Sequence, residues 1–368
     1  MAEPAIAVNL LWCVPGEVGG SEEYLVRQLL GLAEVWPQLR PTLYVVDGFV
    51  EAHRDVAELC PTVVASFDRS SRPRRILGEL TWFRSRTKAA DLRHHGGGTA
   101  PIGAQRPYVL TIHDLQYLTY PEHFSPTKRT YLAGMIGRSV RRARIVAVPS
   151  EYVRRSVIDA FGAGEDKVRV VPHGVEADLL VNATPEDELR RRYSLGDGPV
   201  IVYPAVTNPH KNHRFLVDLM SSKWRDADLR LVFTGGAGPA EDEVVAATSD
   251  PRIRRVGRVS AADRNGLLKM AEAMTFPSLY EGFGAPLIEA MAIGCPVVAS
   301  DATCIPAVVD GAGLVLPLDV DAWAGALDVV RRDRDTLVEA GRRRAEAFTA
   351  RASGVALAEV YRAALDHS

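Results

Sequence analysis

Short and almost uninterrupted apolar runs recur along the whole chain, and stretches with helical periodicity lie between them. Apolar runs without polar alternation are typical of strands that are covered on both faces. Strands that alternate with helices predict parallel sheets in doubly wound α/β domains. The strands we expect are 6–13, 43–46, 62–65, 108–112, 145–148 and 168–171 in the first half of the chain, and 200–203, 229–234, 274–277, 296–299 and 313–316 in the second half.

The length and composition limit the class of protein. A chain of 368 residues predicts about two domains. Apolar residues make up 47% of the chain and charged residues 24%, which excludes a disordered or fibrous protein. The 44 Lys and Arg residues nearly balance the 46 Asp and Glu residues, so the overall charge gives no reason to expect nucleic-acid binding.

The cysteines and the N-terminus predict a cytoplasmic location. The four cysteines stand singly and show neither metal-ligand nor Cys-x-x-Cys spacing, so we expect reduced thiols and no metal site. The first residues, Met-Ala-Glu-Pro, lack the basic start of a secretory signal. No run of 18 apolar residues occurs, so we expect no membrane-spanning helix.

The strand–helix pattern is interrupted once, between Gly174 and Gly198, by a polar segment rich in Glu and Arg that contains Pro185. We interpret this segment as a linker between two α/β domains of similar size. Ligands of such sheets bind outside the carboxyl ends of the strands, near helix N-termini. The domains we expect are an N-terminal domain 1–175, a linker 176–197, a C-terminal domain 198–345 and a last helix 346–368 that packs back across both domains.

One segment, 69–93, is strongly basic, with eight Lys and Arg residues against two acids, and it also contains apolar residues such as Leu77 and Trp82. A basic amphipathic helix of this kind suits contact with anionic lipid, which would place the protein peripherally on the inner face of the membrane. The alternative is an ordinary surface helix whose apolar side belongs to the core.

The stretch 278–298 carries the strongest chemical signal. It reads as a strand end, a glycine loop, a helix, a tight turn and another strand. Glycines let backbone amides approach a ligand closely, and a helix N-terminus suits a diphosphate. Glu281 precedes the helix and Glu289 lies about one turn inside it, so both carboxylates can accept hydrogen bonds from hydroxyl groups beside the anion. The alternative is a glycine turn with two surface acids.

This stretch resembles the Glu-x7-Glu signature of the family 4 retaining glycosyltransferases. The segment 204–213 is similar to the Lys-containing donor loop of that family, and the segments 111–115, 149–151 and 171–175 match its subgroup typified by O-antigen mannosyltransferase B. The resemblance extends over nearly the whole chain. It implies the GT-B fold, in which two Rossmann-like domains with doubly wound parallel sheets face each other across a cleft.

The resemblance also implies roles for individual residues. Glu281 and His113 would be catalytic and lie against the transferred sugar. Glu289 would accept hydrogen bonds from the ribose, and Lys211 would neutralise the diphosphate. The remaining donor-binding candidates are Gly282, Phe283, Gly284, Gly19, Gly20, His210 and Arg258, with Ser21 as the cap of the helix after the glycine pair. On the acceptor side we expect Asp114, His94 and His95, although the two histidines also fit a flexible loop.

The sequence departs from the family pattern at two positions. Val206 stands where the family often has an arginine, five residues before the lysine, and His210 or Arg258 is then expected to supply the missing charge. Ala307 stands where a glutamate often follows the proline equivalent to Pro306, so one contact of the family is absent here.

The resulting expectation is a retaining hexosyltransferase, with mannose favoured. Its donor is a nucleoside diphosphate sugar, its acceptor is a hydroxyl of a glycan or a lipid-linked saccharide, and it needs no metal or other cofactor. Two alternatives from other classes remain. One is a GT-B-fold sugar-nucleotide-binding protein with weak or lost turnover, which the changes at Val206 and Ala307 would fit. The other is a sugar-nucleotide epimerase.

Overall fold

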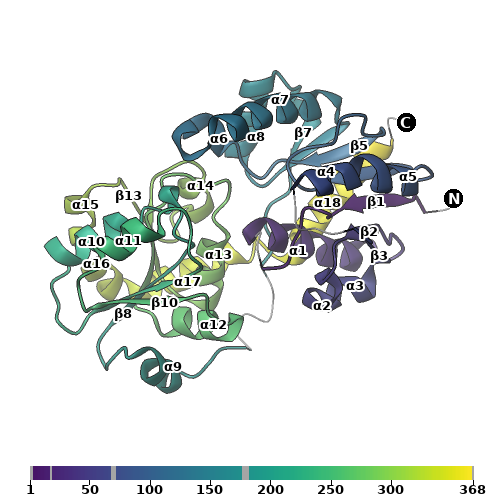
Figure 1. The fold of residues 1–368 in the computed structure, drawn as a ribbon. Helices are drawn as coiled ribbons and strands as arrows, with labels where there is room; N and C mark the ends of the chain where they lie inside the picture. Colours follow the sequence, from purple (N-terminus) through teal and green to yellow (C-terminus); the bar gives the residue numbers. More distant parts are fainter. Residues whose placement is uncertain (1–2, 17–18, 68–71, 176–181, 367–368) are drawn as a thin grey trace. The chain divides into compact units, whose positions relative to one another are not determined.

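The structure is a computed structural model that describes residues 3–16, 19–67, 72–175 and 182–366. The chain forms two compact units, of which the first contains residues 1–174 and 349–368 and the second residues 175–348. Both units are α/β, as the strand–helix pattern predicts (Figure 1). In the part of the chain that the structure describes, no helix has the length and apolar character needed to cross a membrane.

The first unit is built on a seven-stranded sheet in which every pair of neighbours is parallel. The strand order is β3-β2-β1-β4-β5-β6-β7. The central strands β1 and β4 are in register from the Ile6–Leu92 pair to the Asn9–His95 pair. The strands are β1 (Ile6–Asn9), β2 (Thr42–Val45), β3 (Thr62–Val64), β4 (Leu92–His95), β5 (Tyr108–Thr111), β6 (Ile145–Val148) and β7 (Val168–Val170).

Helices α1 (Gly20–Val35) and α18 (Ala350–Leu365) lie against each other in the first unit (Figure 1). They cross with their backbones almost in contact, because a Cβ atom on Gly354 would lie 2.0 Å from the carbonyl carbon of Gly31. Both helices contribute buried apolar side chains to one core with β1. The other main helices of this unit are α3 (Arg54–Leu59), α4 (Arg72–Gly78), α7 (Pro126–Arg142) and α8 (Glu151–Phe161), with a π-helix over Glu79–Phe83.

The second unit has a six-stranded parallel sheet in the order β10-β9-β8-β11-β12-β13. Helix α9 (Glu186–Tyr193) lies within the segment that we interpreted as a linker, and it belongs to this unit. The strands are β8 (Val200–Pro204), β9 (Arg230–Thr234), β10 (Ile253–Gly257), β11 (Ala273–Phe276), β12 (Val297–Ser300) and β13 (Leu314–Leu316), and the main helices are α10 (His213–Ser222), α11 (Glu241–Ala247), α12 (Ala261–Met270), α13 (Ala285–Ile293), α16 (Ala326–Arg332) and α17 (Arg334–Ala345).

Two strands of the structure are absent from our sequence expectation. Strand β4 carries Arg93, His94 and His95, and strand β10 carries Arg254 and Arg255, so neither reads as an apolar run. The polar residues of β4 are nevertheless buried at the centre of the sheet. Strand β10 lies at a sheet edge, where polar side chains reach solvent.

Each sheet has one topological switch point, where successive connections leave a strand in opposite directions. In the first unit this point lies between β1 and β4, and in the second unit it lies between β8 and β11. Open α/β sheets bind ligands beside the carboxyl ends of the strands at such a point.

Candidate functional site

The loops that follow β8 and β11 meet at the switch point of the second unit. The backbone N–H of Leu279 donates to the carbonyl oxygen of His210 at 2.7 Å, and the side-chain amide of Asn212 donates to the carbonyl oxygen of Pro277 at 3.3 Å. Asn212 is left-handed, with φ 54°, a conformation that asparagine tolerates better than most residues. These contacts fix the short 3-10 turn Pro209–Lys211 beside the glycine loop.

Lys211 and Glu281 form an ion pair across this junction. Lys211 Nζ lies 2.5 Å from Glu281 Oε1, and the two side chains are 18% and 11% exposed. The ammonium also lies 5.4 Å from the ring centroid of Phe276, within range of a cation–π contact. The hydroxyl of Tyr203 donates to the carbonyl oxygen of Lys211 at 2.6 Å, so the backbone below the ammonium is held as well.

The glycine loop leads directly into helix α13. Gly284 precedes the helix with φ 89°, a conformation that glycine adopts without strain, and Pro286 occupies the first turn, where a missing N–H costs nothing. Glu289 lies in the second turn and is 6% exposed. Its Oε2 is 3.7 Å from Arg264 Nη1 on α12, an ion pair that our sequence reasoning did not include.

This arrangement can bind an anion that carries hydroxyl groups next to it. The ammonium of Lys211 and the positive end of α13 both favour negative charge. Two carboxylates, Glu281 before the helix and Glu289 inside it, can accept hydrogen bonds from neighbouring hydroxyls. A nucleoside diphosphate sugar has this chemistry, with a diphosphate between a ribose and a hexose.

In the first unit, His113 lies just beyond the end of β5. Its Nε2 is 2.7 Å from the carbonyl oxygen of Gly96, so Nε2 carries the proton and donates. The ring lies 5.6 Å from the ring of Trp12 and 5.6 Å from that of Tyr24. Burial lowers the pKa of His113, which favours the neutral imidazole.

Comparison with known proteins finds family models that match both units. A family model described as "Glycosyl transferases group 1" matches residues 198–333, and another described as "Glycosyltransferase Family 4" matches residues 18–179. The chain belongs to the family 4 glycosyltransferases. The family that the sequence resembles is thereby confirmed.

Relatives and solved structures agree with this assignment. The glycosyltransferase is 31% identical over 222 residues to O-antigen chain mannosyltransferase B of Escherichia coli, a match that spans 58% of each chain. It is 26% identical over 291 residues to O-antigen chain mannosyltransferase RfbU of Salmonella typhimurium, covering 75% of this chain and 77% of that protein. The structure of Anabaena HepE in complex with UDP-glucose has a TM-score of 0.74 at 20% identity and covers 98% of this chain and 100% of that chain. The expected GT-B fold is confirmed.

Two expected acceptor-side residues of the glycosyltransferase, His94 and His95, lie in the core instead. They belong to β4 rather than to a loop, and each is 1% exposed. His94 hydrogen-bonds the hydroxyls of Tyr361 and Thr111, both at 2.8 Å. Burial lowers the pKa of both histidines to about 3, so they are neutral. The loop interpretation was wrong. Two adjacent histidines do not read as part of an apolar run, although they lie in a central strand.

The glycine pair of the first unit precedes α1, as expected, but Ser21 does not cap that helix. The helix begins at Gly20, and Gly19, with φ 74°, occupies the cap position without a side-chain hydrogen bond. A Cβ atom on either glycine would meet nothing within 4 Å. Asp114 is exposed, and its Oδ1 accepts a hydrogen bond from the N–H of Gln116 at 2.9 Å, which gives it a local role in the turn after β5.

Arg258 lies close to the loop that carries Val206. It follows the end of β10, and a Cβ atom on Gly236 would lie 3.9 Å from Arg258 Nη2. The carbonyl oxygen of Gly236 in turn accepts from the N–H of Thr207, the residue next to Val206. Arg258 therefore lies near the loop of Val206, and its role as the replacement charge stays a prediction.

Sequence reasoning missed Tyr203 and Phe276, which support Lys211, and Arg264, which faces Glu289. Tyr203 and Phe276 lie inside apolar strands and read as core residues. Arg264 lies on a different helix from its carboxylate. No sequence spacing connects such pairs, because the fold alone brings them together.

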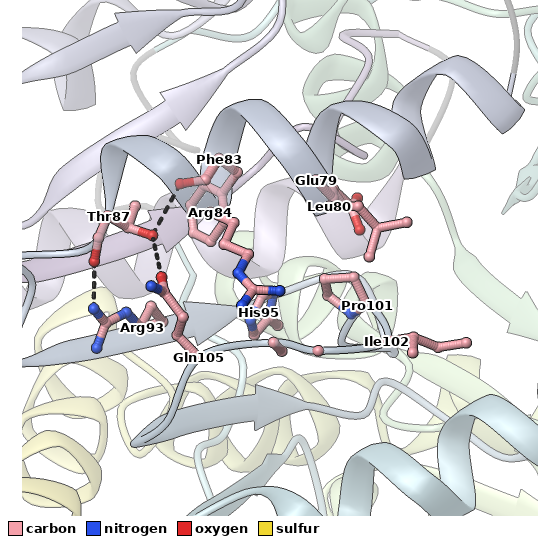
Figure 2. Close-up of a pocket in the computed structure, with 12 residues that line it drawn as sticks. Glu79, Leu80, Phe83, Arg84, Thr87, Arg93, His95, Pro101, Ile102 and Gln105 are labelled. Carbon is pink, nitrogen blue, oxygen red and sulfur yellow. Dashed lines mark hydrogen bonds between the residues drawn. The ribbon is translucent and has the colours of Figure 1, made fainter.

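The first unit also has a small cavity beside His95, between the π-helix and the loop 101–105 (Figure 2). Its free volume of about 10 Å³ is close to that of a single water molecule. His95 Nδ1 faces the side-chain amide of Asn9 at 3.2 Å, so Nε2 carries the proton, and it has no hydrogen-bond partner among the described residues. Burial raises the pKa of Glu79, which also lines the cavity, to about 7.

Proposed function

We propose that this glycosyltransferase moves a hexosyl group, with mannose favoured, from a nucleoside diphosphate sugar to a hydroxyl of a glycan or a lipid-linked saccharide. The observation that carries the proposal is the Lys211–Glu281 pair at the switch point of the second unit, next to α13 and Glu289. Two relatives are mannosyltransferases by name, and a structural neighbour holds UDP-glucose.

In this proposal the difficult step is the cleavage of the bond between the anomeric carbon and the diphosphate. Negative charge then collects on the leaving diphosphate while the sugar becomes oxocarbenium-like. Lys211 and the N-terminus of α13 stabilise the leaving group electrostatically, which is usually the largest catalytic effect. Because they supply positive charge, the proposal requires no metal ion.

We assign Glu281 and His113 to the transferred sugar. The new bond forms on the face that the diphosphate leaves, so the configuration is retained, and a phosphate oxygen accepts the proton of the acceptor hydroxyl. Glu281 then orients the sugar and does not act as a base. This differs from the paired carboxylates of glycoside hydrolases, one of which is a nucleophile or a base.

Thermal shift with UDP, GDP, ADP and TDP, followed by turnover of the matching sugar nucleotides, tests the proposal. The expected result is acceptor-dependent release of the diphosphate and a product with the anomeric configuration of the donor. An inverted product would contradict retention. A change in the sugar without acceptor would favour the epimerase. Tight nucleotide binding without any turnover, across donors and mannoside acceptors, would favour a binding protein.

We further propose that the basic segment 69–93 touches an anionic membrane at the inner face, where a lipid-linked acceptor resides. Residues 69–71 lie outside the described part of the chain. In the remainder, Phe83 and Arg93 are buried and lie away from any membrane surface, whereas Leu77 is 59% exposed. In a sedimentation assay, we expect the protein to pellet with phosphatidylglycerol vesicles. Equal binding to neutral vesicles would contradict the proposal.

A further inference from the structure

The turn after β12 contains a residue in an unfavourable backbone conformation. Thr303 has φ 54°, in the left-handed region that glycine, asparagine and aspartate occupy most readily. Threonine is strained there because its branched Cβ crowds the backbone. Strain of this kind persists where surrounding contacts hold it, and it concentrates at functional sites.

The side chain of Thr303 holds both backbone groups of Glu281. Its Oγ1 accepts a hydrogen bond from the N–H of Glu281 at 3.0 Å and donates to the carbonyl oxygen of Glu281 at 3.0 Å. A side-chain hydroxyl can accept and donate at the same atom in this way.

Cys304 supports the same loop from the next position. Its Sγ lies 3.3 Å from the carbonyl oxygen of Glu281 and 3.3 Å from that of Phe283. The side chain is 1% exposed, and burial together with the charge of Glu281 raises the pKa of the thiol. The thiol therefore keeps its proton and acts as a weak donor that shares this one proton between the two carbonyls.

These contacts fix the backbone from which the Glu281 side chain extends. When the N–H and the C=O of one residue are both held, its Cα–Cβ bond can point in only one direction. From this fixed backbone the carboxylate reaches Lys211, with Oε1 2.5 Å from Nζ, and the ion pair completes its orientation. We propose that Thr303, supported by Cys304, is the positioning residue for the Glu281 carboxylate. This inference rests on the proposed function, in which that carboxylate lies against the transferred sugar.

Three substitutions separate positioning from plain structural support. Thr303→Ser keeps the hydroxyl, Thr303→Ala removes it and keeps the backbone strain, and Thr303→Gly removes both. We expect the alanine and glycine variants to lose turnover equally, by about 10- to 100-fold, because a misplaced Glu281 orients the sugar poorly, with little change in the donor KM. The serine variant should keep most of the turnover.

The melting temperature supplies the second readout. Glycine accepts φ 54° without strain, so the glycine variant should melt above the alanine variant although it is equally impaired. If turnover instead follows melting temperature across the three variants, Thr303 is only structural and the proposal is wrong. Wild-type kcat in the glycine variant would also overturn it.

Glu281→Gln in the same assay separates this proposal from the proposed function. If Glu281→Gln lowers turnover and Thr303→Gly does not, only the positioning role fails. If Glu281→Gln is without effect, the assigned role of Glu281 fails and the positioning role fails with it. The proposal predicts that Thr303→Gly costs much less turnover in the Glu281→Gln background than in the wild type, because the carboxylate that it positions is already gone.

Discussion

The lysine and the glutamate at the centre of the site neutralise each other in the absence of donor. Lys211 and Glu281 are both mostly buried, and a lone charge there would be costly. A diphosphate that enters the site offers the ammonium a second negative partner. The pair therefore keeps the ammonium in place and the carboxylate oriented.

Glu289 gives a prediction at the scale of one carboxylate. If its oxygens accept hydrogen bonds from the ribose, the wild type should bind a nucleoside diphosphate more tightly than its 2′-deoxy analogue. Hydrogen bonds to charged groups contribute about 1.5–3 kcal/mol, or roughly 10- to 100-fold in affinity. Glu289→Gln should reduce this discrimination in calorimetry.

The exposed Glu339, on α17, supplies the control for that experiment, since its side chain is 77% exposed and pairs with Arg343. Glu339→Gln should leave the discrimination unchanged. Equal discrimination in the wild type and in Glu289→Gln would contradict the assignment of Glu289 to the ribose.

Glu79 gives a prediction for the pH dependence of stability. Burial raises its pKa from 4.5 to about 7, while Arg75 and Asn9 oppose this shift. Between these values the folded protein holds a proton that the unfolded chain releases, so stability falls as the pH rises from about 4.5 to about 7 and the cost persists above pH 7.

Replacement of Glu79 by Gln removes this titration. The free energy of unfolding of Glu79→Gln, relative to the wild type, should rise between pH 5 and pH 8 by on the order of 1–3 kcal/mol. Urea unfolding at several pH values measures it, and the exposed Glu58→Gln is the control. A constant difference between Glu79→Gln and the wild type would show that Glu79 is ionised throughout.

At the scale of elements, the closest packing in the first unit is between α1 and α18. Gly354 lies so near Gly31 that a Cβ atom would overlap the backbone of α1. Gly354→Ala should therefore force the helices apart and destabilise the protein by about 1–3 kcal/mol or more, as overpacking does.

Gly134 is the matched control for this prediction. It lies on the exposed side of α7, and a Cβ atom there would meet nothing within 4 Å. Gly134→Ala should stabilise the protein by roughly 0.5–1 kcal/mol, because alanine is the better helix former. Chemical unfolding of the two variants should give shifts of opposite sign, and similar shifts would contradict the close crossing.

At the scale of the whole molecule, apolar runs were sufficient to predict two doubly wound parallel sheets and most of their strands. They were insufficient where polar residues occupy strands. Strand β4 is central although it contains His94 and His95, because three of their four ring nitrogens find partners in Asn9, Thr111 and Tyr361. Such partners come from distant segments of the chain, so no local sequence pattern predicts them.

The same limit applies to the site. Glu281, Glu289 and Lys211 were predicted because a glycine loop, a helix start and a family resemblance point to them. The residues that hold them were not predicted. Thr303 contacts the backbone of Glu281 from a left-handed backbone position. Tyr203, near the end of an apolar strand, donates its hydroxyl to the carbonyl oxygen of Lys211. Both roles depend on atoms that only the folded chain brings within hydrogen-bond distance.

The most direct test of the account is whether Lys211 recognises the diphosphate. Calorimetry measures how tightly the wild type and Lys211→Gln bind a nucleoside diphosphate and the corresponding monophosphate. Both ligands carry the base that thermal shift selects, so the difference in affinity gives the contribution of the outer phosphate. The account predicts that the wild type prefers the diphosphate by about tenfold or more and that the variant loses most of this preference. A Lys211→Gln variant that folds and keeps the wild-type preference would contradict the account.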